Sequence, residues 1–237
     1  MRVAIDAARH TLRATSIATC IATRIATWIA TWIATCIATW IAIGTACAPL
    51  HSNSNPLLES HDIVVISSDA SAVRPFEGPS GQLVAFVFIS HECPIANAMA
   101  PDILAIAASA RESGAQFYAV HPAVWVDNAM IGAHAKAFGY APLTAVLHDD
   151  EQRITNAIGA TMTPGAALVR LDGEGGFTLL YLGRVNDLYA AVGRRKANAT
   201  SHDFADALDA ARAGRTIPST QPKAIGCFIE LQQRSRS

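Results

Sequence analysis

The sequence predicts an α/β domain in which a mixed sheet is covered by helices. Short apolar runs alternate with helix-like segments through most of the chain after residue 62. One run, residues 83–89, is apolar throughout and too short for a helix, as expected for a strand buried on both faces. Residues 172–176 form a turn-rich segment between two further strand-like runs and indicate a hairpin. With 237 residues, the chain is long enough for one such domain and an extension at each end.

The first fifty residues have a different character from the rest. A four-residue unit repeats over residues 16–41, in forms such as Cys-Ile-Ala-Thr and Trp-Ile-Ala-Thr. On a helix, a period of four residues advances by about 400°, so the isoleucines wrap round the helix and leave it apolar on all sides. No charged residue lies between residues 25 and 50, whereas arginines precede this stretch. This pattern predicts an export signal or membrane anchor over residues 1–50, and hence an exported protein that is periplasmic or membrane-anchored.

The end of this segment leaves several alternatives open. The small residues at 44–46 suit cleavage by a signal peptidase, and Cys47 directly after them is a candidate for lipid modification. The segment can also span the membrane, or be a low-complexity extension without a targeting role. Residues 51–62 have the composition of a linker. We expect the folded domain over residues 63–217 and a C-terminal tail, which carries Cys227, over residues 218–237.

The elements of the folded region follow in order. It begins with a β-branched, strand-like run at 63–66. Residues 96–110 are rich in Ala, Met, Ile and Leu at helical spacing and precede Gly114, so they are predicted to form one helix that ends at a glycine. The remaining predicted strands are 116–120, 143–147, 165–171 and 177–182, and the remaining predicted helices are 128–138, 150–158 and 201–213.

Composition argues against several classes of function. The net charge of -1 gives no support for a nucleic-acid partner. Cys93 and Cys227 are the only cysteines after the N-terminal apolar segment, so a scaffold held by disulfides is excluded. The histidines at 121, 134, 148 and 202 lack metal-ligand spacing and are predicted to be solvent-facing or satisfied locally, and no metal is expected. Asp149 and Asp150 precede a helix and are predicted to cap it.

Cys93 is the strongest candidate for chemistry. It follows the apolar run 83–89 and precedes a predicted helix, and in such sheets reactive groups gather where a central strand ends. A helix N-terminus presents unpaired N–H groups that stabilise a thiolate. Pro94 suits the first helical position because its missing N–H has no partner to lose there. The alternative is a buried, inert cysteine.

Three segments together resemble a known family. They are Ser90-His91-Glu92-Cys93-Pro94-Ile95, Thr163-Pro164 before a strand, and Tyr181-Leu182-Gly183-Arg184 followed by Asp187. In this order they resemble the redoxin group of thioredoxin-like proteins, which is related to the AhpC/TSA family, and in particular bacterial exported proteins with a Gly-Cys near the C-terminus. The resemblance covers about residues 63–230. It implies a thioredoxin-like sandwich with a central mixed sheet flanked by helices.

The resemblance also implies roles for individual residues. Cys93 takes the place of the nucleophilic cysteine, and Pro164 that of a cis-proline that faces it and leaves backbone groups free to pair with a substrate strand. Pro94 and Thr163 would then contact substrate. Arg184 either binds a substrate anion or forms a surface ion pair, and Thr163-Pro164 is alternatively an ordinary trans turn.

Departures from the family pattern narrow the chemistry. Ala96 stands where thioredoxins have their second cysteine, so no local disulfide can form. Phe86 replaces the proline found upstream of the peroxidatic cysteine in peroxiredoxins, and Asn97 replaces the second cysteine of copper-delivering relatives. Cys227 is the remaining candidate for a resolving thiol, provided that the tail up to about residue 229 returns to the start of the helix after Cys93.

We therefore expect a thiol-dependent oxidoreductase that needs no cofactor. Cys93 would attack a disulfide or peroxide substrate, either protein or small molecule, and an external thiol would act as reductant. The N-terminal segment would provide the membrane contact. The alternative is a non-catalytic binding or accessory module that retains the fold without the chemistry.

Overall fold

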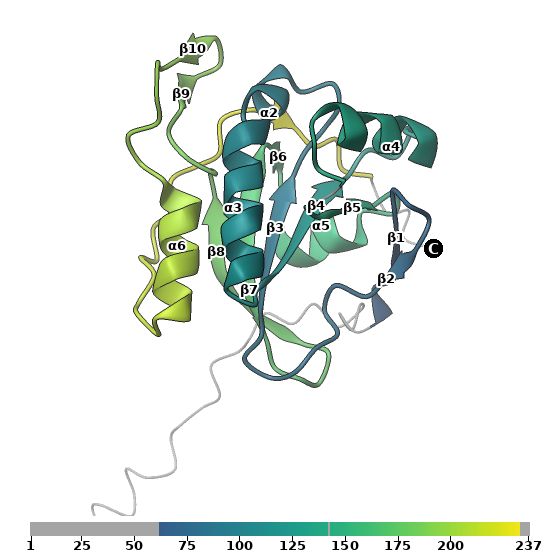
Figure 1. Cartoon of the computed structure of the whole chain (residues 1–237), viewed down its shortest axis with the longest axis vertical. Coiled ribbons are helices and arrows are strands. Elements are labelled where there is room, and N and C mark those ends of the chain that lie inside the picture. The colour runs from purple at the N-terminus through teal and green to yellow at the C-terminus, as the bar shows by residue number, and fades with distance from the viewer. Residues whose placement is uncertain (1–61, 142, 233–237) are drawn as a thin grey trace, which may run out of the picture. The chain divides into compact units, whose positions relative to one another are not determined.

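The computed structural model describes residues 62–141 and 143–232 (Figure 1). The predicted signal or anchor over residues 1–50 and nearly all of the predicted linker lie outside the described residues. Within the described part of the chain, no helix combines the length and apolar character needed to cross a bilayer.

A seven-stranded mixed sheet forms the centre of the domain, with strand order β2-β1-β5-β4-β3-β7-β8. Its strands are β1 (Val65–Ser67), β2 (Ala72–Val73), β3 (Leu83–Phe88), β4 (Gln116–His121), β5 (Ala145–His148), β7 (Gly165–Leu171) and β8 (Phe177–Gly183). The neighbours β3, β4 and β5 run parallel, whereas β7 runs antiparallel to β3 and β8 antiparallel to β7. The predicted buried strand and the predicted hairpin are both confirmed.

Helices cover both faces of this sheet. They are α2 (Pro94–Ala98), α3 (Ala100–Glu112), α4 (Asn128–Ala137), α5 (Arg153–Ile158) and α6 (Asp203–Arg212). Apolar side chains of α3, α4 and α6 pack on one face, and those of α5 pack on the other. Strand β3 serves both cores because its side chains alternate: Val87 belongs to the first and Phe86 to the second. In Figure 1, α3 and α6 lie in front of the sheet and α5 behind it.

The helix predicted over residues 96–110 is divided in two. Strand β3 leads through residues 89–93 to α2, which ends at Ala98. Met99 caps it, and α3 starts at the next residue. Pro101 explains the break, because its ring crowds the carbonyl four residues earlier and it has no N–H to donate. The short helix α2 thus presents Cys93 independently of the long axis of α3.

Two small two-stranded sheets were not predicted. Strands β9 (Tyr189–Ala191) and β10 (Arg194–Arg195) form one, and β6 (Met162–Thr163) pairs antiparallel with β11 (Cys227–Phe228) to form the other. The second sheet brings the C-terminal segment back to the domain, since Cys227 lies opposite Thr163 in the register. This is the predicted course of the tail.

Candidate active site

Cys93 occupies the N-cap position of α2 at the end of the central strand β3. Its backbone is extended, with φ -86° and ψ 104°, and Pro94 follows at the start of the helix. The thiol donates to the Thr163 carbonyl oxygen at 3.0 Å, and the sulfur accepts from the Ala96 N–H at 3.5 Å. Only 1% of the residue is exposed. The sulfur therefore has one partner for its proton and another for its lone pair, and both lie inside the protein.

Cys227 lies beside Cys93. Both cysteines are free, and Cys227 is half-buried on β11. Burial, together with a side-chain hydrogen bond to Cys93 and the charge of that group, raises the pKa of Cys227 to about 11. Cys227 therefore keeps its proton at neutral pH, and it lines the same cavity as Cys93, the predicted nucleophile.

The turn at Thr163 and Pro164 joins the two cysteines. The peptide bond between these residues is cis, as the family resemblance implied. The Thr163 carbonyl contacts Cys93, while its hydroxyl donates to the Cys227 carbonyl oxygen at 3.5 Å. Of the six predicted site residues, the structure gathers five here: Cys93, Pro94, Thr163, Pro164 and Cys227.

A small cavity opens at the two cysteines. Its volume is about 250 Å³. It is lined by Ser90, Glu92, Cys93, Pro122, Ala123, Trp125, Thr163, Cys227, Phe228, Ile229 and Glu230. Trp125 is 59% exposed and Phe228 is 83% exposed. Because typical sites for drug-sized ligands start at roughly 300 Å³, this space suits a small molecule or a single side chain.

Four histidines cluster beside this centre, although three of them were expected to face solvent or to be satisfied locally. His91 precedes Cys93 by two residues, and its ring stacks on that of His121 at a centroid distance of 5.4 Å. The His134 ring meets His121 edge-on at 6.0 Å. His148 is opposite His121 in the register of β5 and β4. Of the four histidines that lack metal-ligand spacing in the sequence, only His202 lies elsewhere, as the N-cap of α6.

The cluster holds the backbone at His91, two residues before Cys93. The His91 N–H donates to His121 Nε2 at 3.1 Å, so this nitrogen carries no proton. On the other side, Asn97 Nδ2 donates to the His91 carbonyl oxygen at 2.9 Å, and Asn97 Oδ1 accepts from His134 Nε2 at 2.8 Å. Both polar groups of the His91 backbone are therefore fixed by the cluster.

Burial favours the neutral forms of His121 and His134. Burial, followed by the charges of His91, His134 and His148, lowers the pKa of His121 to about 3. Burial and His91 also lower the pKa of His134. His121 Nδ1, His134 Nδ1 and His148 Nε2 are buried without a protein partner. No three His, Cys, Asp or Glu side chains among the described residues are arranged to hold a metal ion.

The sequence did contain a sign of this cluster. His91 follows β3, and His121 and His148 end β4 and β5. The three strands are parallel neighbours, and the carboxyl ends of such strands meet at one edge of a sheet. Reading the three positions together, instead of searching for local metal-ligand spacing, would have predicted that they meet.

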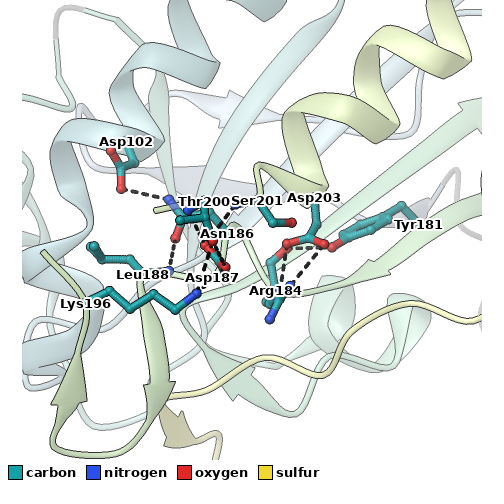
Figure 2. A network of polar contacts seen from close by, with 10 residues as sticks. All are labelled: Asp102, Tyr181, Arg184, Asn186, Asp187, Leu188, Lys196, Thr200, Ser201 and Asp203. Carbon is teal, nitrogen blue, oxygen red and sulfur yellow. Dashed lines mark hydrogen bonds and ion pairs between the residues drawn. The ribbon is translucent and has the colours of Figure 1, made fainter. Parts of the chain in front are cut away.

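Arg184 lies in a separate polar network (Figure 2). Its guanidinium donates to both carboxylate oxygens of Asp203, at 2.7 and 3.2 Å. Burial disfavours the Asp203 charge, but hydrogen bonds from Arg184 and Ser201 outweigh it and lower the pKa of Asp203. Arg184 is not among the described residues that line the cavity at Cys93. Arg184 therefore forms an ion pair with Asp203, which was the alternative to binding a substrate anion.

The neighbouring Asp187 organises the loop after β8. It accepts hydrogen bonds from Lys196, from the Thr200 N–H and hydroxyl, and from the Ser201 N–H. These bonds, led by that of Lys196, hold the pKa of Asp187 well below its usual range. The network fixes the segment of β9 and β10 against the start of α6, so Asp187 supports the scaffold (Figure 2).

Asp149 acts as the predicted cap. Its carboxylate accepts from the Ile154 and Thr155 N–H groups at 3.1 and 2.8 Å, and from the Thr155 hydroxyl at 2.7 Å. The N-terminal N–H groups of α5 are thereby satisfied. The N-cap position itself belongs to Gln152, whose backbone is left-handed with φ 53°.

The fold of the domain is similar to that of solved structures. No known family model and no curated protein matches the chain. A hypothetical protein from Sinorhizobium meliloti is 24% identical, with TM-score 0.59 over 70% of this chain and 89% of its own. An uncharacterized conserved protein from Geobacillus kaustophilus is 22% identical, with TM-score 0.59 over 73% and 90%. A secreted disulfide oxidoreductase from Mycobacterium tuberculosis is 16% identical, with TM-score 0.44 over 64% and 98%. The chain has the thioredoxin-like fold, built on a mixed seven-stranded sheet with helices on both faces.

Proposed function

We propose that this protein is a thiol-dependent oxidoreductase in which Cys93 is the nucleophile and Cys227 resolves the product. The observation that carries the proposal is that two free thiols from distant parts of the chain line one cavity on either side of Thr163. Cys93 caps α2 and donates to the Thr163 carbonyl, and Cys227 lies opposite Thr163 on β11. A binding module that had lost its chemistry would have no need of this pair, so the pair argues against the alternative.

With a hydroperoxide, the Cys93 thiol loses its proton, the thiolate attacks the terminal oxygen and the O–O bond breaks, while the proton passes to the alkoxide or hydroxide that leaves. The sulfur becomes a sulfenic acid, and the alcohol or water leaves. The Cys227 sulfur then attacks the sulfenic sulfur, so that an S–S bond forms and the hydroxyl departs with the Cys227 proton as water. An external dithiol supplies two electrons and two protons, which restore both thiols.

With a disulfide substrate the same residues act in the same order. Cys93 attacks one sulfur, a mixed disulfide forms and the first substrate thiol leaves. Cys227 then attacks Cys93 in the mixed disulfide and releases the second thiol. The raised pKa of Cys227 suits this order, because a protonated thiol does not compete for the first attack.

The test compares Cys93→Ser with Ala98→Ser in the full chain. Ala98 is exposed on α2 and supplies a matched control for a new hydroxyl on the same helix. Turnover of hydrogen peroxide and of a small disulfide, each with a dithiol reductant, is expected to vanish in Cys93→Ser and to persist in Ala98→Ser. Full turnover in Cys93→Ser would reject the proposal.

Mass mapping tests the role of Cys227. After mild peroxide treatment, the wild type is expected to give a peptide linked through Cys93 and Cys227, and Cys227→Ser is expected to accumulate sulfinic acid at Cys93. Sulfinic acid at Cys93 in the wild type, with Cys227 still free, would reject the two-cysteine cycle.

The proposal extends to the location of the protein. We propose that residues 1–50 direct the chain out of the cytoplasm, and that residues 51–62 connect this segment to the domain. Fractionation of the native host is expected to recover the protein from the periplasmic or membrane fraction. An unprocessed chain in the soluble cytoplasmic fraction would contradict this.

A further inference from the structure

The C-terminal segment 218–232, here called the strap, covers the reactive sulfur. Pro94 is exposed, yet Cys93 beside it is almost wholly buried. The strap residues from Cys227 to Glu230 line the cavity at Cys93, and the other side of the cavity includes Pro122 and Trp125. One wall of the cavity is therefore part of the strap.

The centre of the strap is seated directly on the turn before Pro164. Strand β11 pairs with β6, and the Ile229 N–H donates to the Thr161 carbonyl oxygen at 2.9 Å. At Gly226, a Cβ atom would lie 2.0 Å from the Thr163 carbonyl oxygen and 2.9 Å from Pro164 Cδ. Glycine is thus the residue that allows the strap to approach this closely.

A glutamine side chain holds the strap after Cys227. Gln152 is fully buried, its Nε2 donates to the Glu230 and Pro122 carbonyl oxygens at 2.7 and 3.0 Å, and its Oε1 accepts from the Gln232 N–H at 2.8 Å. Its left-handed backbone, with φ 53°, is uncommon for a residue with a side chain. Such a conformation persists where surrounding contacts determine it, and here the side chain makes them.

A second glutamine holds the strap before Cys227. Gln221 Oε1 accepts from the Leu182 N–H at 2.5 Å, and its Nε2 donates to the Leu180 and Pro218 carbonyl oxygens at 3.1 and 3.2 Å. The two glutamines belong to opposite sides of the contact: Gln152 reaches the strap from the domain, and Gln221 reaches β8 from the strap. Cys227 therefore lies on a segment that is clamped at both ends.

We propose that the clamped strap is a size gate, and that Gln152 and Gln221 determine which oxidants reach Cys93. This specificity rests on the proposed function. While the strap is seated, a peroxide or another small oxidant enters the cavity of about 250 Å³, whereas a bulky disulfide is kept from the sulfur. Because the strap also carries Cys227, the closed state that admits only small oxidants is the same state that resolves them.

The experiment measures access to Cys93 with one reactive group at two sizes. N-ethylmaleimide and a maleimide on a long polyethylene glycol chain are compared in the full, reduced chain, and modification is read on the Cys93 peptide. Gln152→Gly removes the clamp, and glycine tolerates the left-handed backbone at this position. Ala70→Gly is the matched control, since Ala70 also has a positive φ, of 65°, and lies in the turn between β1 and β2.

The wild type and Ala70→Gly are expected to react with the small reagent and to resist the bulky one. In Gln152→Gly, loss of three hydrogen bonds is expected to raise the rate of the bulky reagent by roughly tenfold or more. The yield of the Cys93–Cys227 disulfide after peroxide treatment is expected to fall in the same variant. Gly226→Ala disturbs the contact of the strap with Thr163 and Pro164 and leaves Gln152 in place. It is also expected to raise the rate of the bulky reagent.

The outcomes separate the gate from the chemistry. If the small and bulky reagents react in the wild-type ratio in both Gln152→Gly and Gly226→Ala, the gate is overturned, even when Cys93→Ser abolishes turnover. If the ratio shifts but no form of the protein turns over peroxide or disulfide, the gate stands and the proposed function fails. Equal modification of wild-type Cys93 by both reagents would also overturn the gate.

Discussion

Acidification should destabilise this protein through His121. Its pKa in the folded chain is about 3, against an ordinary value of 6.5. Between these two pH values the unfolded chain therefore binds a proton at this residue and the folded chain does not. Stability from this residue is complete above the unfolded pKa and falls as the pH drops through the window between the two values. Between about pH 8 and about pH 5 the loss amounts to about 2 kcal/mol. His134, whose pKa is also lowered, adds to it with the same sign.

Urea unfolding at the two pH values measures this loss. His121→Gln retains a neutral acceptor for the His91 N–H at every pH, so its acid loss is expected to be smaller than that of the wild type by about 2 kcal/mol. His202→Gln, at an exposed position before α6, should keep the wild-type loss. Carboxylates such as Asp149, whose pKa is raised by burial, cancel in the difference. An equal acid loss in His121→Gln and the wild type would refute the reasoning.

Two further substitutions test the scaffold. Arg184→Met leaves the Asp203 carboxylate without its bidentate partner and is expected to lower the free energy of unfolding in urea by about 1–3 kcal/mol. The rate of Cys93 alkylation is expected to stay unchanged. A changed rate would show that Arg184 acts at the site. Phe86→Ala removes a fully buried ring from the centre of β3 and is expected to cost about 3–5 kcal/mol, and a loss below about 1 kcal/mol would show that the second core is loosely packed.

The parts of the fold that sequence reasoning recovered have strong local patterns. Strand β3 is apolar at every position because both of its faces are buried. A run of this kind can be recognised in the sequence without knowing which strands pair with it. Cys93 was placed correctly at the end of that strand for the same reason. The division between α2 and α3 was also legible, since Pro101 marks it, but the continuous Ala-rich composition favoured a single helix.

The parts that were missed depend on distant segments. Strands β6 and β11 have two residues each, too few for any periodicity, and each exists only because the other pairs with it. The contacts between Gln152 and the strap likewise join residues that are far apart in the chain. His121 and His148 meet through the parallel register of β4 and β5, which the spacing of histidines along the sequence does not reveal.

The position of Cys227 on the last described strand has a consequence for how the site matures. A ribosome synthesises Cys93 and its whole central sheet before it reaches β11, so the two thiols can meet only after nearly all of the chain has been made. Until then, β6 lacks its strand partner and the Cys93 sulfur lacks its cover. If the sheet forms before the C-terminal segment docks, Cys93 is open to thiols and disulfides in its surroundings, and docking of that segment ends the exposure.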